Sequence, residues 1–209
     1  MGRATARAPM DKPAAALNAP LFRLLVEQLD TAGRHVILDL GAASTPMLSL
    51  LGGSRCRVEI ADLACDGGIG RINTEATEAA ADALVTTAES LLPKHQSDDD
   101  VDLVFCWDML NYLKPEAISA LMNAIAARAR PGALAHALIV YSERSMPDRP
   151  GRFVPTGDLK LVNHAAPAAA IQAPRYSPEF LGRIMGRFAI EHARLLGNGM
   201  QEFLFRLRT

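Results

Sequence analysis

Three short segments of strand-forming residues, separated by segments with helix signals, constrain the fold of this chain more than any other feature. They cover residues 35–40, 57–61 and 101–107, and each is followed by a glycine or an aspartate. A strand that is buried on both faces reads as an apolar run, as the first and third segments do. The repeated order of strand, helix and strand is typical of right-handed parallel crossovers. We therefore expect a mostly parallel sheet with helices packed on both of its faces.

The first two helices are predicted from apolar spacing and from capping residues. Leucines within 21–29 recur on one helical face, and Gly33 is expected to end this helix. Thr45 is the expected N-cap of the second helix, because Pro46 fits the first helical position, where its missing N–H costs nothing. This second helix is predicted over residues 46–51.

The middle of the chain leaves one alternative open. The alanine-rich segment 73–92 favours a helix, although residues 84–87 also fit a short strand. Pro115 opens a further helix with apolar residues at helical spacing, and Pro131-Gly132 is expected to end it. Residues 135–141 then return to the sheet.

The last third of the chain contains a long irregular stretch followed by a hairpin. Prolines and glycines scattered through residues 143–176 exclude long regular elements, and loops of that length are usually functional or disordered. Ser177 is a strong N-cap for a helix that begins with proline. Residues 189–196 and 200–207 flank a Gly-Asn-Gly turn, which predicts two antiparallel strands. The fold class is thus a three-layer, doubly wound α/β sheet that ends in an antiparallel β-hairpin.

Length and composition indicate one domain. The chain has 209 residues, of which 49% are hydrophobic and 22% charged, as expected of a globular protein. We expect a flexible N-terminal leader over residues 1–19 and a single domain over 20–209. No segment approaches the roughly 18 to 20 apolar residues that a membrane-spanning helix needs.

Charge and cysteine usage exclude several classes of function. With 22 Lys and Arg against 23 Asp and Glu, the net charge of -1 gives no overall attraction for nucleic acid or for an anionic membrane. Cys56, Cys65 and Cys106 show no CxxC spacing, so neither a disulfide framework nor a structural zinc site is expected. The five histidines show no metal-ligand spacing either. We expect reduced thiols, a cytoplasmic location and no metal site.

The candidate site lies where the predicted strands end. In an open parallel sheet, ligands bind at the carboxyl ends of the strands, where the strand order reverses. Three such ends are the segments 39–45, 62–63 and 106–108. An acid at the end of the second strand, here Asp62, is placed to accept hydrogen bonds from the two hydroxyls of a ribose. This pattern predicts a cofactor that contains a nucleoside.

These segments resemble the class I S-adenosylmethionine-dependent methyltransferase family. The matching segments are Val36–Gly41, Val58–Asp62 and Asp102–Leu113, with Arg130–Gly132 and the closing hairpin also similar. The resemblance covers roughly residue 21 to the C-terminus. It implies the Rossmann-like methyltransferase fold and S-adenosylmethionine as cofactor.

The resemblance also implies roles for individual residues. The loop from Gly41 would face the methionine part of the cofactor, Asp62 the ribose, and the segment around Asp108 the site of methyl transfer. The residues expected to bind cofactor are Asp39, Gly41, Ala43, Asp62, Leu63 and Asp108. No catalytic residue is assigned.

The sequence departs from the family pattern in the loop after the first strand. Ala43 and Thr45 occupy the second and third positions at which the family has glycine, and Pro46 follows at once. Glycine is favoured there because it tolerates positive φ and lets backbone approach a ligand, whereas a β-branched residue resists positive φ. Either the loop takes another path with Thr45 as a helix cap, or the cofactor pocket is partly closed.

Each candidate residue also has a purely structural interpretation. Asp39 fits a role in binding backbone amides of the turn, and Asp62 fits a solvated strand end. Asp108 is equally suited to capping the following helical segment and to touching a substrate. Trp107 is expected to pack in the core rather than to stack on an adenine. Cys106 is expected to be an inert buried thiol.

The leading hypothesis is an S-adenosylmethionine-dependent methyltransferase with a small-molecule acceptor. Direct methyl transfer needs positioning rather than a catalytic triad, and a proton from an amine or hydroxyl acceptor could pass to Asp108 or to an acid within residues 143–158. The excursion over residues 142–176 is expected to border the acceptor site. The alternative is a non-catalytic binding or scaffold protein with a degenerate cofactor loop. A nicotinamide-dependent oxidoreductase is disfavoured, because the loop lacks two of the three glycines that a pyrophosphate needs.

Overall fold

The fold is one mixed sheet with helices on both faces. A computed structural model describes residues 16–29, 33–78, 81–94, 100–164 and 168–209. The sheet has six strands in the order β2-β1-β3-β4-β10-β9. Its strands are β1 (Arg34–Asp39), β2 (Arg55–Ile60), β3 (Val101–Trp107), β4 (Ala129–Val140), β9 (Phe188–Leu195) and β10 (Met200–Leu207). Strands β2, β1, β3 and β4 are mutually parallel, and β10 pairs antiparallel with both β4 and β9. The predicted fold class, including the closing hairpin, is confirmed.

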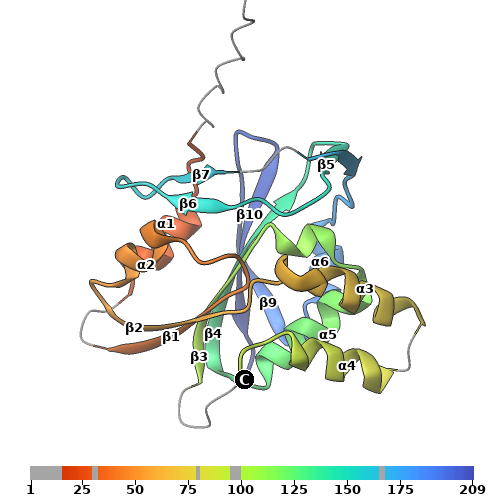
Figure 1. The fold of residues 1–209 in the computed structure, drawn as a ribbon. Helices are drawn as coiled ribbons and strands as arrows, with labels where there is room; N and C mark the ends of the chain where they lie inside the picture. The colour runs from red at the N-terminus through yellow and green to blue at the C-terminus, as the bar shows by residue number, and fades with distance from the viewer. Residues whose placement is uncertain (1–15, 30–32, 79–80, 95–99, 165–167) are drawn as a thin grey trace, which may run out of the picture.

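The helices form a layer on each side of the sheet (Figure 1). Helices α1 and α2 lie on one side, and α3 to α6 lie on the other. Their bounds are α1 (Pro20–Glu27), α2 (Thr45–Leu51), α3 (Gly68–Glu78), α4 (Ala81–Ser90), α5 (Pro115–Ala126) and α6 (Pro178–Ile184). Two 3-10 helices, η1 (Cys65–Gly67) and η2 (Met109–Tyr112), follow the ends of β2 and β3. In the part of the chain that the structure describes, no helix is both long and apolar enough to cross a membrane.

Both faces of the central strands are buried, which explains their apolar runs. Along β1, Ile37 packs with α1 and α2, whereas Val36 and Leu38 pack on the opposite side with α3 to α5. All seven residues of β3 are buried. Because successive side chains of a strand point to opposite faces, a strand between two helical layers must be apolar at consecutive positions.

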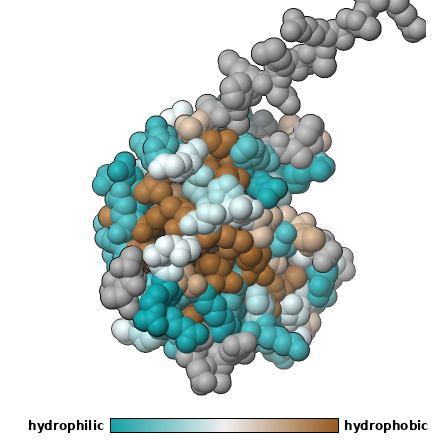
Figure 2. Space-filling view, turned by 60° about the vertical axis from the view of Figure 1, so that its left-hand side comes forward, coloured by the Kyte–Doolittle hydropathy of each residue, from teal (hydrophilic) through white to brown (hydrophobic). Residues whose placement is uncertain are grey.

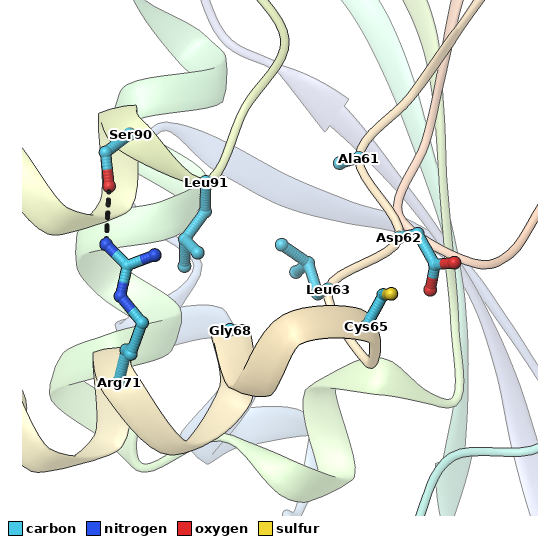
Figure 3. A pocket seen from close by; sticks show the side chains of 8 residues that line it. All are labelled: Ala61, Asp62, Leu63, Cys65, Gly68, Arg71, Ser90 and Leu91. Carbon is cyan, nitrogen blue, oxygen red and sulfur yellow. Dashed lines mark hydrogen bonds between the residues drawn. The ribbon is translucent and has the colours of Figure 1, made fainter.

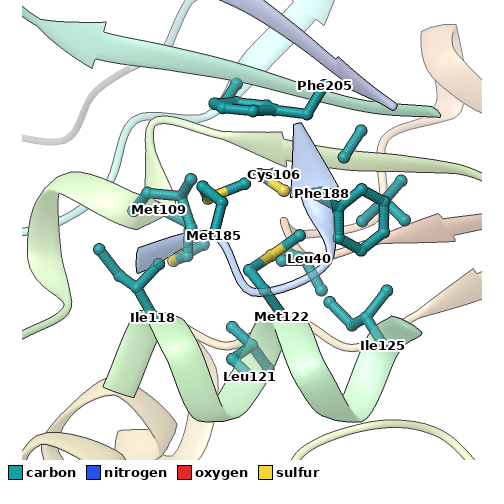
Figure 4. Packing of buried hydrophobic residues seen from close by; sticks show 14 of the residues in the cluster. Leu40, Cys106, Met109, Ile118, Leu121, Met122, Ile125, Met185, Phe188 and Phe205 are labelled. Atoms are coloured by element: carbon teal, nitrogen blue, oxygen red, sulfur yellow. The ribbon is translucent and has the colours of Figure 1, made fainter. Parts of the chain in front are cut away.

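The side that carries α5 holds the larger core. Figure 4 shows Ile118, Leu121, Met122 and Ile125 of α5 packed beneath the sheet, with Met109 and Met185 nearby. Methionine side chains are unbranched and fill irregular gaps between elements that meet at an angle. A chain with few aromatic residues thus still fills this core.

The α1 side is held by a buried carboxylate. Glu202 of β10 has no exposed surface, and its Oε1 and Oε2 accept hydrogen bonds from the N–H groups of Phe22 (2.8 Å) and Leu21 (3.0 Å). The His136 Nε2 of β4 lies 2.8 Å from Oε1. Ala19, the residue before α1, has no side chain that could cap the helix. Glu202 therefore supplies from the sheet the acceptors that the first turn of α1 requires.

Helices α1 and α2 cover their side of the sheet only thinly. They have 8 and 7 residues, and they leave Leu24 and Leu48 exposed. Figure 2, which brings this side of the molecule forward, shows apolar surface interrupted by hydrophilic residues.

Three predicted helix boundaries are wrong. Helix α1 ends at Glu27 rather than near Gly33, because the N–H of Leu29 bonds to the Val26 carbonyl (3.3 Å), three residues back, instead of continuing the α-helical pattern. The N-cap of α2 is Ser44 rather than Thr45, because Ser44 is extended and its Oγ accepts from the Met47 N–H. Helix α5 ends at Ala126, and the Pro-Gly pair at 131–132 lies within β4. Gly132 has φ +81° where the register of β3 and β4 shifts, so this glycine serves a strand irregularity.

The open alternative in the middle of the chain is decided in favour of helix. Residues 84–87 belong to α4, which packs on α5 and buries Ala88 in the core rather than extending the edge of the sheet at β2. The predicted second strand, 57–61, is observed as β2 two residues earlier at its start and one at its end.

Within its described residues, the excursion between β4 and α6 contains only short strands. They are β5 (Ser145–Pro147), β6 (Phe153–Pro155), β7 (Leu161–Asn163) and β8 (Ala170–Gln172), paired as β5 with β8 and β6 with β7. Of the predicted leader, residues 1–15 lie outside the described residues. Leu17 forms a backbone bridge to Leu161 of β7. The excursion and the chain before α1 thus meet beside the β6–β7 hairpin.

Glu202→Ala should destabilise the protein by about 3 kcal/mol, because it leaves two helix N–H groups and His136 without their buried acceptor. Urea unfolding followed by circular dichroism measures this. The matched control is Glu191→Ala on the neighbouring strand β9, where Glu191 forms an exposed ion pair with Arg206 at 2.8 Å. The free energy of unfolding of Glu191→Ala should be lower than that of the wild type by less than about 1 kcal/mol. A loss for Glu202→Ala no larger than that of the control would contradict the assigned role.

Candidate functional site

The candidate site lies where the order of the strands reverses. From β1 the chain goes outward to β2, then returns to form β3 on the other side of β1. In such a sheet the loops that leave β1 and β3 diverge at their carboxyl ends, and we call the space between these two loops the crevice. Asp39, Asp62 and Asp108 stand at the ends of β1, β2 and β3, as the sequence predicts.

Asp39 connects the ends of β1 and β3. Its Oδ1 accepts hydrogen bonds from the Gly41 N–H (2.8 Å) and from the Trp107 indole N–H (2.6 Å). Burial raises the pKa of Asp39 to about 6, against the lowering effect of these two donors. The turn-organising role considered for Asp39 is therefore real. It does not exclude contact with a ligand.

The glycine at position 41 provides space rather than an unusual backbone angle. A Cβ placed there would lie 2.7 Å from Cδ1 of Trp107, and the φ of Gly41 is not positive. The φ angles of Ala43 and Thr45 are not positive either. Because Ser44 caps α2 and Thr45 begins it, the loop takes a path that needs no glycine at positions 43 and 45. The first of the two alternatives for this loop is thus the observed one, with the cap one residue earlier.

Asp62 borders a cavity of about 310 Å³ beside the end of β2. Figure 3 shows Leu63 and Leu91 on opposite sides of this space, Arg71 and Ser90 at one end, and Asp62 at the other, next to the strands. The Arg71 Nη2 donates to the Ser90 Oγ at 3.3 Å. The cavity thus has a mixed lining, in which Leu63 and Leu91 are apolar and Arg71, Ser90 and Asp62 are polar.

Three features fix the backbone around this cavity. Asp62 has φ +41°, which is uncommon for a residue with a side chain and is found often at functional sites. The buried Leu63 donates its N–H to the Leu40 carbonyl at 3.0 Å. A Cβ at Gly68 would lie 2.9 Å from the Leu63 carbonyl oxygen, so this glycine permits α3 to approach the loop.

Asp108 is buried beneath the excursion. Its Oδ2 accepts from the Gly151 N–H at 2.8 Å, and its Oδ1 is buried without a hydrogen-bond partner. Burial raises the pKa of Asp108 to about 7. The carboxylate makes no capping bond to η2, so the capping interpretation is not supported.

Trp107 and Cys106 serve the core. The Trp107 ring is stacked on Phe105 (5.2 Å between centroids) and on Phe153 of the excursion (6.0 Å). Its φ of +50° is strained and turns the chain at the end of β3. Cys106 is fully buried, and burial raises the pKa of its thiol to about 12, so it is inert at neutral pH.

The excursion covers the ends of β1 and β3 with one short segment, residues 148–153. Besides the bond of Gly151 to Asp108, the Arg152 Nη2 donates to the Ala43 carbonyl at 3.0 Å, and the Tyr112 hydroxyl donates to the Arg149 carbonyl at 2.8 Å. A second cavity, of about 410 Å³, opens beside this segment. It is lined by Ala64, Ile69, Tyr112, Asp148, Arg149 and Pro150.

Sequence reasoning missed the residues that α3, α4 and the excursion bring to the site. Arg71, Ser90 and Leu91 come from elements whose packing no local pattern specifies. Arg152 had no signal beyond its place in the irregular stretch. Among the described residues, no group of three or more His, Cys, Asp or Glu side chains could hold a metal ion.

Comparisons with known proteins place the fold. No family model and no curated protein sequence matches the chain. Among solved structures, the chain is similar to the glycopeptide N-methyltransferase MtfA in complex with S-adenosylmethionine, at a TM-score of 0.51 and 14% identity, over 98% of this chain and 100% of that one. It is equally similar to the PH0226 protein of Pyrococcus horikoshii, at a TM-score of 0.51 and 13% identity, over 90% and 88% of the two chains. At such identities the similarity establishes the fold.

Gly41→Ala should destabilise the protein by about 1–3 kcal/mol, because the new methyl group overlaps the Trp107 ring. The control is Gly53→Ala, where nothing lies within 4 Å of the added Cβ. Thermal unfolding of both variants compares them, and an equal melting temperature would contradict the close packing at Gly41.

Asp108→Asn should change the pH dependence of stability in a defined direction. Because the pKa of Asp108 is raised on folding, its protonated form stabilises the folded state below the unfolded pKa, and this contribution is lost as pH rises through about 7. Between pH 5 and pH 8 the free energy of unfolding of the wild type should therefore fall by about 2–3 kcal/mol relative to that of Asp108→Asn.

Urea unfolding across this pH range measures the difference, with Asp158→Asn as the control. The side-chain hydrogen bonds of Lys160 and Thr156 lower the pKa of Asp158 to about 2. The difference in unfolding free energy between Asp158→Asn and the wild type should therefore stay constant between pH 5 and pH 8. If the difference in unfolding free energy between Asp108→Asn and the wild type were also constant over this pH range, the prediction would be wrong.

Proposed function

Because the chain has the fold of the class I S-adenosylmethionine-dependent methyltransferases, we propose that it transfers a methyl group from S-adenosylmethionine to a small-molecule acceptor. When bound, this cofactor supplies an activated methyl group on a sulfonium. The similar MtfA structure contains the same cofactor. What the chain itself must provide is binding, orientation and a place for the acceptor.

The position of Asp62 carries the proposal. Asp62 follows the end of β2 and borders the cavity of about 310 Å³, and its carboxylate points away from Leu63 and Leu91 toward the strands (Figure 3). A carboxylate accepts two hydrogen bonds from the vicinal hydroxyls of a ribose, and the apolar walls formed by Leu63 and Leu91 suit the faces of a purine. The residues present therefore fit the nucleoside part of the cofactor.

The loop after β1 fits the amino-acid part. Asp39 lies directly below the Gly41 amide, and its carboxylate is of the sign that would stabilise an ammonium group. Ala43 is exposed and carries only a methyl group, whereas Gly41 is buried beside Trp107. Asp39, Gly41 and Ala43 are therefore proposed, with Asp62 and Leu63, to bind the cofactor.

The acceptor would enter on the side of the excursion. The cavity of about 410 Å³ combines the apolar Ile69 and Pro150 with the Tyr112 ring, and Asp148 and Arg149 stand at its edge. In-line positioning of a bound acceptor can supply much of the rate acceleration. Asp108 is proposed to contact the cofactor or the acceptor, since its Oδ1 is a buried acceptor without a partner. For an amine or hydroxyl acceptor, it would accept the proton, provided that residues 148–153 move aside.

The non-catalytic alternative loses one of its supports. It rested on Ala43 and Thr45 as a degenerate glycine loop, and the loop is formed without positive φ at either residue. The balanced charge of the chain supports a small acceptor rather than a nucleic acid. A cytoplasmic location remains our expectation from the cysteine pattern.

Asp62→Ala should weaken the binding of S-adenosylmethionine roughly ten- to a hundredfold, because hydrogen bonds to a charged group contribute about 1.5–3 kcal/mol. Isothermal titration calorimetry measures this. Asp82→Ala, at an exposed position on α4, should bind like the wild type. Absence of heat and of any thermal shift for the wild type at millimolar cofactor would remove the proposed function.

A further inference from the structure

The amino-acid end of the proposed cofactor carries two charges, an ammonium and a carboxylate. A charge that is removed from water needs an opposite charge or several hydrogen bonds. At the end of β1 the chain provides the Asp39 carboxylate, which suits the ammonium. The loop itself, residues 41–44, reads Gly-Ala-Ala-Ser and has no cationic side chain. A partner for the carboxylate must therefore come from another element.

Arg152 brings a guanidinium to this loop from the excursion. Its Nη2 donates to the Ala43 carbonyl at 3.0 Å, two residues after Gly41. Arg152 lies far from Ala43 in the sequence, so the contact exists only in the folded chain.

The backbone on both sides of Arg152 is fixed. Gly151 donates to Asp108 at 2.8 Å, and Phe153 is stacked on Trp107 with an interplanar angle of 8°. The Arg152 carbonyl accepts from the His164 N–H at 2.8 Å, within the hairpin that contains β6 and β7. The contacts of Gly151 and Phe153 join this segment to the end of β3, and the bond from His164 joins Arg152 to the hairpin. The guanidinium is thus presented to the crevice by a defined backbone.

A guanidinium has five N–H donors in a fork that matches a carboxylate, and a single bond to Ala43 uses one of them. We propose that Arg152 binds the α-carboxylate at the amino-acid end of the nucleoside cofactor, and that it thereby links cofactor binding to the position of residues 148–153 over the crevice. This inference rests on the proposed function and adds to it a residue that determines specificity. With Asp39 facing the ammonium, the site selects a nucleoside that carries a zwitterionic amino acid over one that does not.

Two ligands that differ in the amino-acid end test the assignment. S-adenosylhomocysteine carries the carboxylate, whereas 5′-methylthioadenosine has the same nucleoside and thioether but no amino acid. Calorimetric titration of the wild type should give tighter binding for S-adenosylhomocysteine. Arg152→Ala should weaken the binding of S-adenosylhomocysteine roughly ten- to a hundredfold and leave the affinity for methylthioadenosine within about twofold of the wild-type value. Arg152→Lys should recover part of the loss, because it keeps the charge without the fork.

The matched control is Arg144→Ala, which removes an exposed arginine from the same excursion and should leave both affinities unchanged. The emission of the single tryptophan, Trp107, which is stacked on Phe153, checks that each variant keeps the native arrangement. Hydrogen exchange supplies an independent readout: S-adenosylhomocysteine should protect residues 148–153 in the wild type, and methylthioadenosine should not.

The outcomes separate the two proposals. A wild type that binds neither ligand overturns the proposed function and this inference with it. A wild type that binds both, with Arg152→Ala weakening both ligands equally or neither, overturns the role of Arg152 alone. The same holds if both ligands protect residues 148–153 to the same extent.

Discussion

The Asp39 carboxylate joins the two strands between which the order of the sheet reverses. Through the Gly41 amide and the Trp107 indole, it fixes the loop that leaves β1 against the end of β3. Trp107 in turn occupies the space that a side chain at position 41 would fill, and it carries Phe153 on its ring. This one buried acid thus determines how the ends of β1 and β3 are arranged. The need for glycine at position 41 and the packing of the excursion on Trp107 follow from that arrangement.

The excursion forms part of the candidate site at the ends of β1 and β3. Residues 148–153 contact the ends of β1 and β3 by backbone and side chain, and they bury the Asp108 carboxylate. A loop that is joined to a ligand-binding edge at several points can respond to what binds there. Under the proposed function, cofactor affinity and access of an acceptor would be coupled through this loop.

Much of the fold could be predicted because its causes are local. The helix start at Ser177 and the turn between β9 and β10 follow from capping and turn chemistry, and the apolar strands follow from burial on two faces. One alternative that the sequence left open and one wrong boundary were decided by distant contacts. The α4 segment 84–87 has residues that fit a strand, and its packing against α5 makes it helical. Pro131-Gly132 resembles a helix end, and the pairing of β4 with β3 places it inside a strand.

The sequence by itself determined the order of the elements and the placing of three acids, Asp39, Asp62 and Asp108, at the ends of parallel strands, since these follow from periodicity and from residues next to each other in the chain. Only the tertiary structure decided what surrounds those acids. It brought Arg152 to the loop after β1, Gly151 to Asp108 and Leu91 to the cavity beside Asp62. These contacts join residues far apart in sequence, and their formation depends on packing that no local pattern encodes.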